Sequence, residues 1–355
     1  MLKPGSTIGI LGGGQLGRMM AMAAVQLGYR CIGYAPPGDN VAADVCVDFF
    51  ENGWGEKDAL AAFASQCDAI TWEFENVPLS VVGAMPPDRL APAPKALEVA
   101  QDRLNEKAFV EQLGATCAPY MRVDSDEDLM RAIDRIGAPG ILKTARDGYD
   151  GKGQWRIASR REAAGIRFPW RTCVYEGFVE FDAEFSVILV RDAQGNVRIW
   201  SSTANEHEDG ILARSILPAG PAVESQVEAA RDIAAKVANA LQYVGVLTLE
   251  FFATANGPVF NEMAPRVHNS GHWTIEGAAT SQFENHIRAI AGLPLGATET
   301  RFANIEMRNI VGEDALTAHQ ILAEEGEPHL HLYGKKKARE GRKMGHVTRV
   351  SHSAK

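Results

Sequence analysis

Short β-rich runs alternate with helical runs along the first part of the chain, and this alternation constrains the fold more than any other feature. The segments TIGIL (7–11), YRCIGY (29–34) and DAITWEF (68–74) have the composition of buried strands. A helical sequence that ends at Gly28 follows the first strand, and a second helical sequence precedes the third. Strands that alternate with helices in this way form parallel sheets. We therefore predict a doubly wound parallel sheet at the N-terminus.

A glycine-rich turn, GGGQLG (12–17), follows the first strand and fits the dinucleotide-binding pattern G-x-G-x-x-G. That pattern also requires an acidic residue at the end of the second strand, where it binds ribose hydroxyls. Here the second strand ends with Ala35 and two prolines, so we do not expect a nicotinamide cofactor. Two interpretations remain. The turn is a tight connection without a ligand, or the helix N-terminus binds an anion such as phosphate within reach of Gln15.

Two carboxylates follow in WEFENVP (72–78), at the end of the next strand. Ligands of open α/β sheets lie beyond the carboxyl ends of the strands. We expect Glu73, between two aromatic residues, to face whatever lies over the glycine turn. For Glu75, a solvated strand end is a serious alternative.

The second segment begins near Pro92. ALEVAQDRLNEKAFVEQLG (96–114) predicts one long amphipathic helix, with Gly114 just beyond its end. Ser125 and Asp128 have the spacing of a capping box for the next helix. β-rich runs then dominate, and a further helix is expected over about 222–242.

A second glycine-rich loop lies in ILKTARDGYDGKGQW (141–155). The Walker A pattern requires G-x-x-x-x-G-K-[ST] before a helix, whereas this loop lies between two strands. Its glycines would still let backbone N–H groups approach phosphates, and Lys143 on the preceding strand would supply positive charge. The alternative is a flexible hairpin loop with a surface lysine.

Paired carboxylates in LTLEFFATANGPVFNEMAPR (247–266) give the clearest metal signal. A three-residue turn at 255–257 would place Glu250 opposite Glu262. Because like charges opposite each other destabilise a sheet, a divalent cation shared with phosphate oxygens would explain the pair. Asn261 would add an oxygen ligand. The alternative is that one glutamate points to solvent.

Composition excludes several classes of protein. The net charge of −9 provides no basic field for nucleic acid, and the chain has neither a secretory signal pattern nor an apolar run of the ~20 residues that a membrane span needs. The five cysteines are scattered, which predicts reduced thiols in the cytoplasm rather than disulfides or a zinc site.

The run NEMAPRVHNSGHW (261–273) combines a carboxylate, a guanidinium, two imidazoles and two amides, which a simple core element would not contain. Together with GYDGKGQW, WEFENVP and GRKMGHVT, it resembles the ATP-grasp superfamily and, within it, the 5-(carboxyamino)imidazole ribonucleotide synthetase family. The similarity extends over essentially the whole chain. Members of this family usually carry a further terminal segment after GRKMGHVT, so the packing of the C-terminal end is left open.

The resemblance implies an α/β fold with three parts. These are an N-terminal doubly wound pre-ATP-grasp domain at 1–100, a central α+β ATP-grasp region at 101–298 with a lid at about 118–180, and a small C-terminal part at 299–355. It also implies a reaction in which ATP, bicarbonate and 5-aminoimidazole ribonucleotide give the N5-carboxylated ribonucleotide, ADP and phosphate, through carboxyphosphate, in purine biosynthesis. The implied cofactors are ATP and Mg²⁺, and a cytoplasmic homodimer is expected.

The resemblance assigns roles to residues by matching positions. It assigns magnesium to Glu250 and Glu262, and catalysis to Arg266, His268, Asp150 and Lys152. The residues implied for ATP are Arg103, Lys143, Gly148, Tyr149, Asp150, Gly151, Lys152, Gly153, Gln154, Glu176, Gly177, Phe178, Val179, Glu184, His207, Asn261 and Glu262. The residues implied for the ribonucleotide and the carboxyl group are Gln15, Leu16, Glu73, Tyr149, Lys152, Arg266, Arg342 and Lys343, with Asp150 also facing the ribonucleotide.

Several alternatives stay open. Another ATP-grasp ligase, or a nucleotide-binding protein without activity on the same fold, would share many of these motifs. The general base is either His268 or Asp150. We interpret His272 as a packing residue beside Trp273, and Arg339 and Lys335–Lys337 as possible solvated charge.

Overall fold

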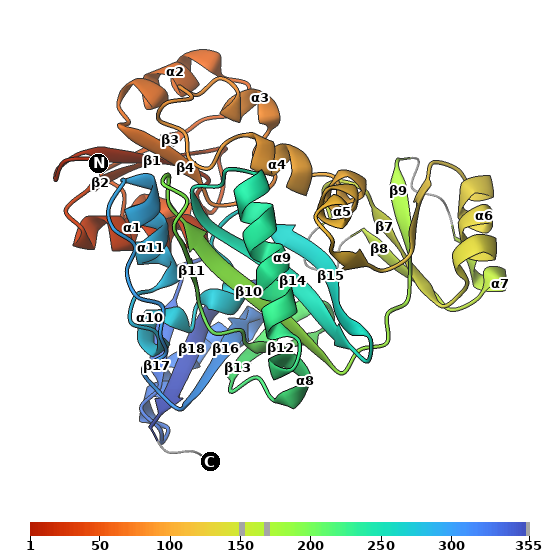
Figure 1. Ribbon diagram of the computed structural model, residues 1–355. Coiled ribbons are helices and arrows are strands. Elements are labelled where there is room, and N and C mark those ends of the chain that lie inside the picture. The colour runs from red at the N-terminus through yellow and green to blue at the C-terminus, as the bar shows by residue number, and fades with distance from the viewer. Residues whose placement is uncertain (149–152, 167–170, 353–355) are drawn as a thin grey trace.

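The computed structural model describes residues 1–148, 153–166 and 171–352, and its strands form three sheets within these ranges. Figure 1 shows the N-terminal sheet beside a long central sheet, with a smaller sheet and its helices standing to one side. In the described part of the chain, no helix combines the length and the apolar character needed to cross a membrane.

The N-terminal sheet has four strands in the order β3-β2-β1-β4, and every pairing is parallel. This confirms the predicted doubly wound sheet, although β4 ends at Trp72 and leaves Glu73 in the following turn. The elements of this part are β1 (Thr7–Leu11), α1 (Gln15–Gln26), β2 (Arg30–Ala35), η1 (Val41–Asp44), β3 (Asp48–Glu51), α2 (Lys57–Ser65), β4 (Ala69–Trp72) and α3 (Leu79–Val82).

The predicted helix over 96–114 is two helices, so the expectation of one long helix is wrong. Asp102 separates them, because its carboxylate accepts hydrogen bonds from the N–H groups of Leu104 and Asn105 and so starts a new helix. The capping prediction for Ser125 is confirmed, since its hydroxyl accepts from the Asp128 N–H at 3.1 Å. The two helices are α4 (Lys95–Ala100) and α5 (Arg103–Gln112).

The small sheet is antiparallel, in the order β6-β9-β7-β8, and has its own hydrophobic core around Leu129, Leu142 and Tyr175. Lys143 lies on β7 and precedes the glycine-rich loop, as predicted. The elements of this part, which the sequence predicts to be a lid, are β6 (Tyr120–Val123), α6 (Asp126–Ile136), β7 (Gly140–Thr144), β8 (Gln154–Ile157), α7 (Arg160–Ala163) and β9 (Cys173–Gly177).

The central sheet runs β17-β18-β16-β13-β12-β10-β14-β15-β5, with β11 paired to β10. The helix expected over 222–242 is divided into α8 and α9. The strands of the central sheet and the helices between them are β5 (Thr116–Cys117), β10 (Ala183–Arg191), β11 (Val197–Ile199), β12 (Ala204–Glu208), β13 (Ile211–Leu217), α8 (Pro221–Glu224), α9 (Val227–Ala240), β14 (Gly245–Thr254), β15 (Gly257–Ala264), η2 (Asn269–Gly271), α10 (Thr274–Gly277), α11 (Gln282–Ile290), β16 (Asn304–Val311), η3 (Gly312–Leu316), η4 (Ala318–Ala323), β17 (His329–Leu332) and β18 (Lys343–Ser351).

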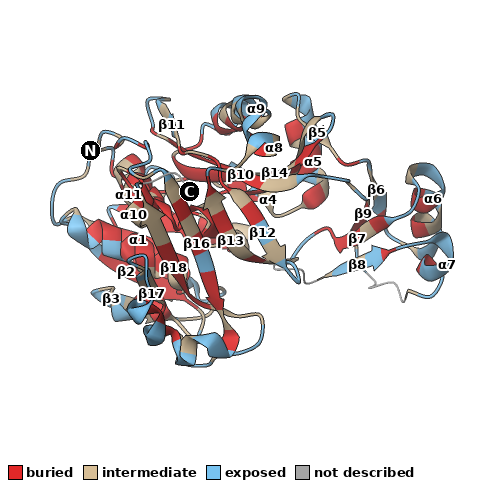
Figure 2. Cartoon of the chain, turned by 90° about the horizontal axis from the view of Figure 1, so that it is seen from below, coloured by how far each residue is buried: buried red, intermediate tan, exposed pale blue. Residues whose placement is uncertain are grey.

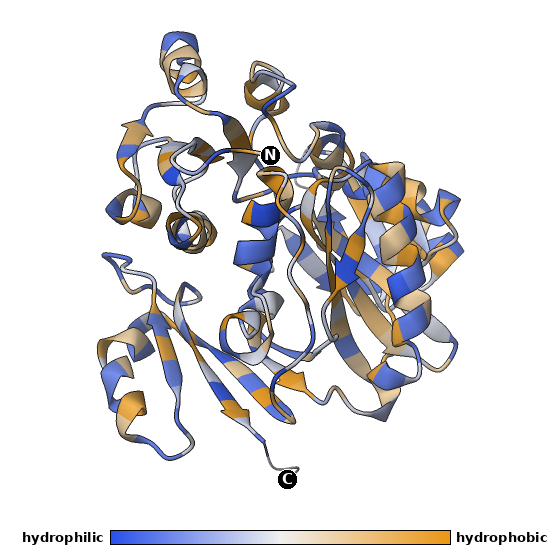
Figure 3. Ribbon diagram, turned by 60° about the vertical axis from the view of Figure 1, so that its left-hand side comes forward, coloured by the Kyte–Doolittle hydropathy of each residue, from blue (hydrophilic) through white to orange (hydrophobic). Residues whose placement is uncertain are grey.

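The C-terminal strands extend the central sheet instead of forming a sheet of their own, because β16 pairs with β13 and β18 with β16. The domain boundaries 1–100, 101–298 and 299–355 stay a prediction. Figure 2 shows buried residues along the central strands and on α1, α10 and α11, and exposed residues on α6 and α7. In Figure 3, hydrophilic and hydrophobic residues alternate along the helices, as expected where one side of a helix packs on a sheet.

A buried histidine joins the N-terminal sheet to the central sheet. His286 Nδ1 accepts a hydrogen bond from the Val246 N–H (3.1 Å), so the ring hydrogen is on Nε2, which lies 2.9 Å from Thr71 Oγ1. Gly245 beside it has a φ of +124°, and a Cβ there would lie 2.9 Å from the imidazole. Burial lowers the pKa of His286 to about 4.

We predict that acidification destabilises the protein partly through His286. Between its ordinary pKa of 6.5 and about 4, the unfolded chain binds a proton at this residue and the folded chain does not. The contribution to stability is therefore complete above this window and is lost as the pH falls through it. One proton taken up in this way lowers the free energy of unfolding by about 1.4 kcal/mol per pH unit.

Urea unfolding at pH 7.5 and pH 5 measures this effect. The loss of stability on acidification should be smaller in His286→Gln than in the unmodified protein. The control is His319→Gln, since His319 is exposed on η4. Equal losses in all three proteins would contradict the prediction.

Candidate active site

A cavity of about 1440 Å³ lies where the three parts of the chain meet. Its wall is built from the glycine turn after β1, the end of β4, the hairpin β14–β15, the loop that follows β15 and the loop before β18. The structure brings these predicted residues together on the wall: Gln15, Leu16, Glu73, Arg103, Gly148, Glu250, Glu262, Arg266, His268, Arg342 and Lys343. Tyr149, Asp150, Gly151 and Lys152 lie outside the described residues.

Glu250 and Glu262 face each other across the hairpin, as predicted, but the predicted turn is wrong. Thr254 pairs with Gly257, so the turn has two residues and not three. A bulge at Asn261 then shifts the register by one residue and restores the pairing of Glu250 with Glu262. Gly257, the first residue after the turn, has a φ of +108°, which favours glycine at this position.

One oxygen of each carboxylate lies near a basic side chain. Arg103 Nη1 lies 2.9 Å from Glu262 Oε2, and His268 Nε2 lies 3.4 Å from Glu250 Oε1. Burial and the neighbouring charge of Glu262 raise the pKa of Glu250 to about 7. Glu262 keeps 41% of its side chain accessible from the cavity.

The described residues contain no group of three or more His, Cys, Asp or Glu side chains suited to a metal ion. Two carboxylates are nevertheless the protein ligands that magnesium takes when substrate phosphates and water complete its shell. The donor set of Glu250 and Glu262 therefore fits magnesium bound together with a nucleotide, and it does not fit a structural zinc site.

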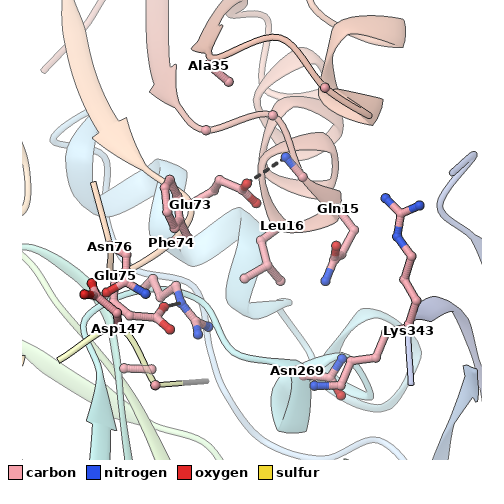
Figure 4. A pocket seen from close by; sticks show the side chains of 18 of the residues that line it. Gln15, Leu16, Ala35, Glu73, Phe74, Glu75, Asn76, Asp147, Asn269 and Lys343 are labelled. Atoms are coloured by element: carbon pink, nitrogen blue, oxygen red, sulfur yellow. Dashed lines mark hydrogen bonds and ion pairs between the residues drawn. The ribbon is translucent and has the colours of Figure 1, made fainter. Parts of the chain in front are cut away.

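The glycine turn does bind an anion at the helix N-terminus, but the anion belongs to the chain itself. The Glu73 carboxylate accepts hydrogen bonds from the N–H groups of Gly14 (2.6 Å) and Gly17 (3.1 Å). A Cβ at Gly12 would lie 2.2 Å from Glu73, so the close approach requires glycine there. Figure 4 shows Glu73 hydrogen-bonded at this turn, with Gln15 extending beside it.

Glu75 is not a solvated strand end. Its carboxylate lies 2.5 Å from Arg266 Nε, and Arg266 also donates to the Val267 carbonyl at 3.0 Å. This ion pair fixes the guanidinium on the cavity wall. The charge of Arg266 in turn outweighs the effect of burial and lowers the pKa of Glu75.

A second charged cluster, which is not part of the cavity wall, lies close enough to the hairpin for the charge of Lys143 to act on Glu262. Lys143 Nζ lies 2.9 Å from one oxygen of Glu176, and Lys107 Nζ lies 3.3 Å from the other. All three side chains are buried, and the two lysines outweigh the effect of burial and lower the pKa of Glu176 to about 2. Lys143 is therefore a buried, paired residue, and the alternative of a surface lysine is wrong.

Glu184 and His207, predicted for the nucleotide, lie on neighbouring strands, and Glu184 Oε2 is 2.7 Å from His207 Nδ1. Burial alone would lower the pKa of His207, but Glu184 outweighs it and raises the pKa. The described candidates that are not part of the cavity wall are Lys143, Gly153, Gln154, Glu176, Gly177, Phe178, Val179, Glu184, His207 and Asn261.

The loop before β18 closes one side of the cavity. Arg342 Nη2 lies 2.9 Å from Asp39, which ties this loop to the N-terminal part. Lys335 is half-buried and donates to the Lys343 carbonyl at 2.6 Å, so the interpretation of Lys335 as solvated charge is wrong. Burial lowers the pKa of Lys335 to about 8. His272 is completely buried, with its ring 5.5 Å from that of Phe283, as expected for a packing residue.

The comparisons with known proteins agree with one another over nearly the whole length of the chain. Residues 5–101 match the ribonucleotide synthetase preATP-grasp domain, residues 108–283 the ATP-grasp domain, and residues 306–355 the phosphoribosylaminoimidazole carboxylase C-terminal domain. The N5-carboxyaminoimidazole ribonucleotide synthase of Brucella melitensis is 50% identical over 98% of this chain and 97% of that protein. This chain belongs to the N5-carboxyaminoimidazole ribonucleotide synthase family.

Solved structures of N5-carboxyaminoimidazole ribonucleotide synthases have the same fold. The synthetase of Thermus thermophilus superposes with a TM-score of 0.89 at 45% identity, over 98% of this chain and 94% of that one. The synthase of Aspergillus clavatus, solved with ADP and 5-aminoimidazole ribonucleotide, superposes with a TM-score of 0.87 at 28% identity, over 99% and 95%.

Sequence reasoning missed two charged residues at this site, Lys107 and Glu106, and one ion pair, that of Glu75 with Arg266. Lys107 is four residues after Arg103 on α5, and this helical spacing could have indicated that both face the same cluster. Glu106 is buried and accepts from the Met263 N–H at 2.7 Å, and burial raises its pKa to about 8. The pairing of Glu75 with Arg266 had no local signal, because the two residues are 191 positions apart.

Proposed function

We propose that this chain uses ATP and bicarbonate to carboxylate the exocyclic amine of 5-aminoimidazole ribonucleotide in purine biosynthesis. The products are N5-carboxyaminoimidazole ribonucleotide, ADP and phosphate. The observation that carries the proposal is the arrangement of Arg103, Glu250, Glu262, Arg266 and His268 around one cavity, in a chain that matches the family from end to end.

The nucleotide would bind between the lid and the hairpin. Lys143 and Arg103 would contact phosphates, and Glu184 with His207 would contact the ribose. The segment from Glu176 to Val179 would line the adenine. Magnesium, held by Glu250 and Glu262, would neutralise the phosphate oxygens during transfer. The raised pKa of Glu250 supports this, because a bound cation would relieve the repulsion between the two carboxylates.

The ribonucleotide would bind at the other end of the cavity. Arg342 and Lys343 would hold its phosphate, while Gln15 and Glu73 would contact the remainder. In Figure 4, Gln15 extends from the helix above the pocket, and Lys343 lies on the right-hand side of the pocket. Leu16 lines the cavity but is largely buried, so it would contribute packing only.

The carboxyl group would be transferred between these two ends. Bicarbonate oxygen attacks the γ-phosphorus of ATP, ADP leaves, and carboxyphosphate forms. The amine then bonds to the carboxyl carbon, phosphate leaves and the amine loses a proton. Arg266, fixed by Glu75, and His268 would stabilise the anion by charge-assisted hydrogen bonds.

The family membership favours the synthase over the two other functions that the sequence left open. Another ATP-grasp ligase would use a different acceptor, and a protein without activity would only bind the nucleotide. The full set of Lys143, Glu250, Glu262, Arg266 and His268 argues against the second, because binding alone would not need all five. Homodimerisation and a cytoplasmic location stay predictions from the resemblance.

ADP release tests the proposed function. Purified protein would be supplied with ATP, Mg²⁺ and bicarbonate, with and without 5-aminoimidazole ribonucleotide. We expect ADP release to depend strongly on the ribonucleotide. ATP binding without this dependence would favour another acceptor or a protein that only binds nucleotides, and would overturn the proposal.

A further inference from the structure

A chain of buried hydrogen bonds runs from His268 on the cavity wall into the central sheet. His268 Nδ1 lies 2.8 Å from Ser270 Oγ, and the hydroxyls of Ser270 and Ser186 are hydrogen-bonded at 2.9 Å. Asn205 Nδ2 donates to Ser186 Oγ at 2.7 Å. This series of hydrogen bonds therefore connects the loop after β15 with strands β10 and β12 of the central sheet.

Asn205 anchors the inner end of this chain. Its Oδ1 accepts hydrogen bonds from Ser215 on β13 (2.8 Å) and from Thr203 (2.9 Å). The other polar side chains of this hydrogen-bond series are at most 6% exposed, and each of them is hydrogen-bonded to another member of the series. A buried polar network in which every member is paired holds its side chains in one arrangement.

The backbone decides which nitrogen of His268 carries the hydrogen. The Ser270 N–H points at His268 Nδ1 at 3.3 Å, and a backbone N–H can only donate. Nδ1 is therefore an acceptor, and the hydrogen of the uncharged ring is on Nε2. That nitrogen lies 3.4 Å from Glu250 Oε1, on the side of the ring that faces the carboxylates of the hairpin.

We propose that Ser270, Ser186 and Asn205 are positioning residues that hold His268 with its Nε2–H directed into the cavity. His268 then donates a hydrogen bond to the carboxyl-bearing anion and does not accept the proton of the amine. This inference rests on the proposed function and deepens it, because it leaves Asp150 as the candidate for the general base.

The test is Ser186→Ala, which removes the middle hydroxyl without changing a residue of the cavity wall. We expect kcat to fall about tenfold while the KM for ATP stays within twofold, because only the orientation of His268 changes. ¹⁵N NMR of ring-labelled histidine, with His268 assigned by its loss in His268→Gln, should show the Nε2–H tautomer in the unmodified protein and a mixture in Ser186→Ala.

The matched control is Thr248→Val on the neighbouring strand β14. Thr248 is completely buried, and its hydroxyl has no hydrogen-bond partner among the described residues. The Thr248→Val substitution should leave both kcat and the NMR signals of His268 unchanged. Because Ser186 pairs with Glu250 across β10 and β14, the magnesium requirement of Ser186→Ala is also measured, and it should be unchanged.

Three results would overturn the inference. The first is an Nδ1–H signal for His268 in the unmodified protein, and this result does not depend on whether Ser186→Ala folds. The second is a Ser186→Ala protein with normal kcat and a normal His268 signal. The third is a raised magnesium requirement in Ser186→Ala, which would show that the substitution acts through Glu250 and not through His268. Since the NMR measurement needs no substrate, it stays informative even if the ribonucleotide is not the acceptor.

Discussion

Replacing Glu262 with glutamine is expected to lower magnesium-dependent turnover by about 10²–10³-fold or more, down to the limit of detection, while the protein stays folded. Glutamine has the shape of glutamate, so the hairpin and its bulge at Asn261 should persist. The variant removes one of the two facing carboxylates and the charge that pairs with Arg103 at 2.9 Å. Steady-state ADP release at several magnesium concentrations measures the effect, and circular dichroism checks the fold.

Glu206→Gln is the matched control for this variant. Glu206 lies on β12 of the same sheet and also pairs with an arginine, Arg214, but it is 51% exposed and is not part of the cavity wall. Its turnover should stay close to that of the unmodified protein. Normal rates from a folded Glu262→Gln protein would refute the metal assignment.

Replacing Lys343 with alanine is expected to raise the KM for the ribonucleotide by about 10–100-fold and the KM for ATP by far less. Lys343 lies at the start of β18, on the wall that Arg342 and the preceding loop provide. The variant loses the charge-assisted hydrogen bond that we propose between Lys343 and the ribonucleotide phosphate, whereas the contacts proposed for Arg103 and Lys143 with the nucleotide are kept. Initial rates with each substrate varied in turn give both constants.

Lys95→Ala controls for the loss of one positive charge, because Lys95 is an exposed residue of α4 that pairs with Glu98. Neither KM should change in this protein. Equal increases of both constants in Lys343→Ala would remove Lys343 from the proposed phosphate contacts and would leave that role to Arg342 alone.

Local patterns predicted the N-terminal sheet, the hairpin and the facing glutamates, because period, turn residues and caps act over a few positions. The errors were local as well. Asp102 interrupts a pattern that otherwise continues as one helix, since its side chain caps α5. The bulge at Asn261 compensates for a turn one residue shorter than predicted, which is why the pairing of Glu250 with Glu262 was right although the turn was wrong.

By itself, the sequence determined the class of fold, the family and a part of the residues that gather at the cavity, because motif spacing and strand order place these residues at the same edges of the sheets. Only the tertiary structure decided their partners. Glu73 binds the glycine turn 59 positions away, and Glu75 binds Arg266 across 191 positions. His268 is oriented through Ser270 by strands that precede it in the chain. Such pairings depend on how separate sheets pack against each other, and no local pattern records the partner of a charge that folding brings into contact.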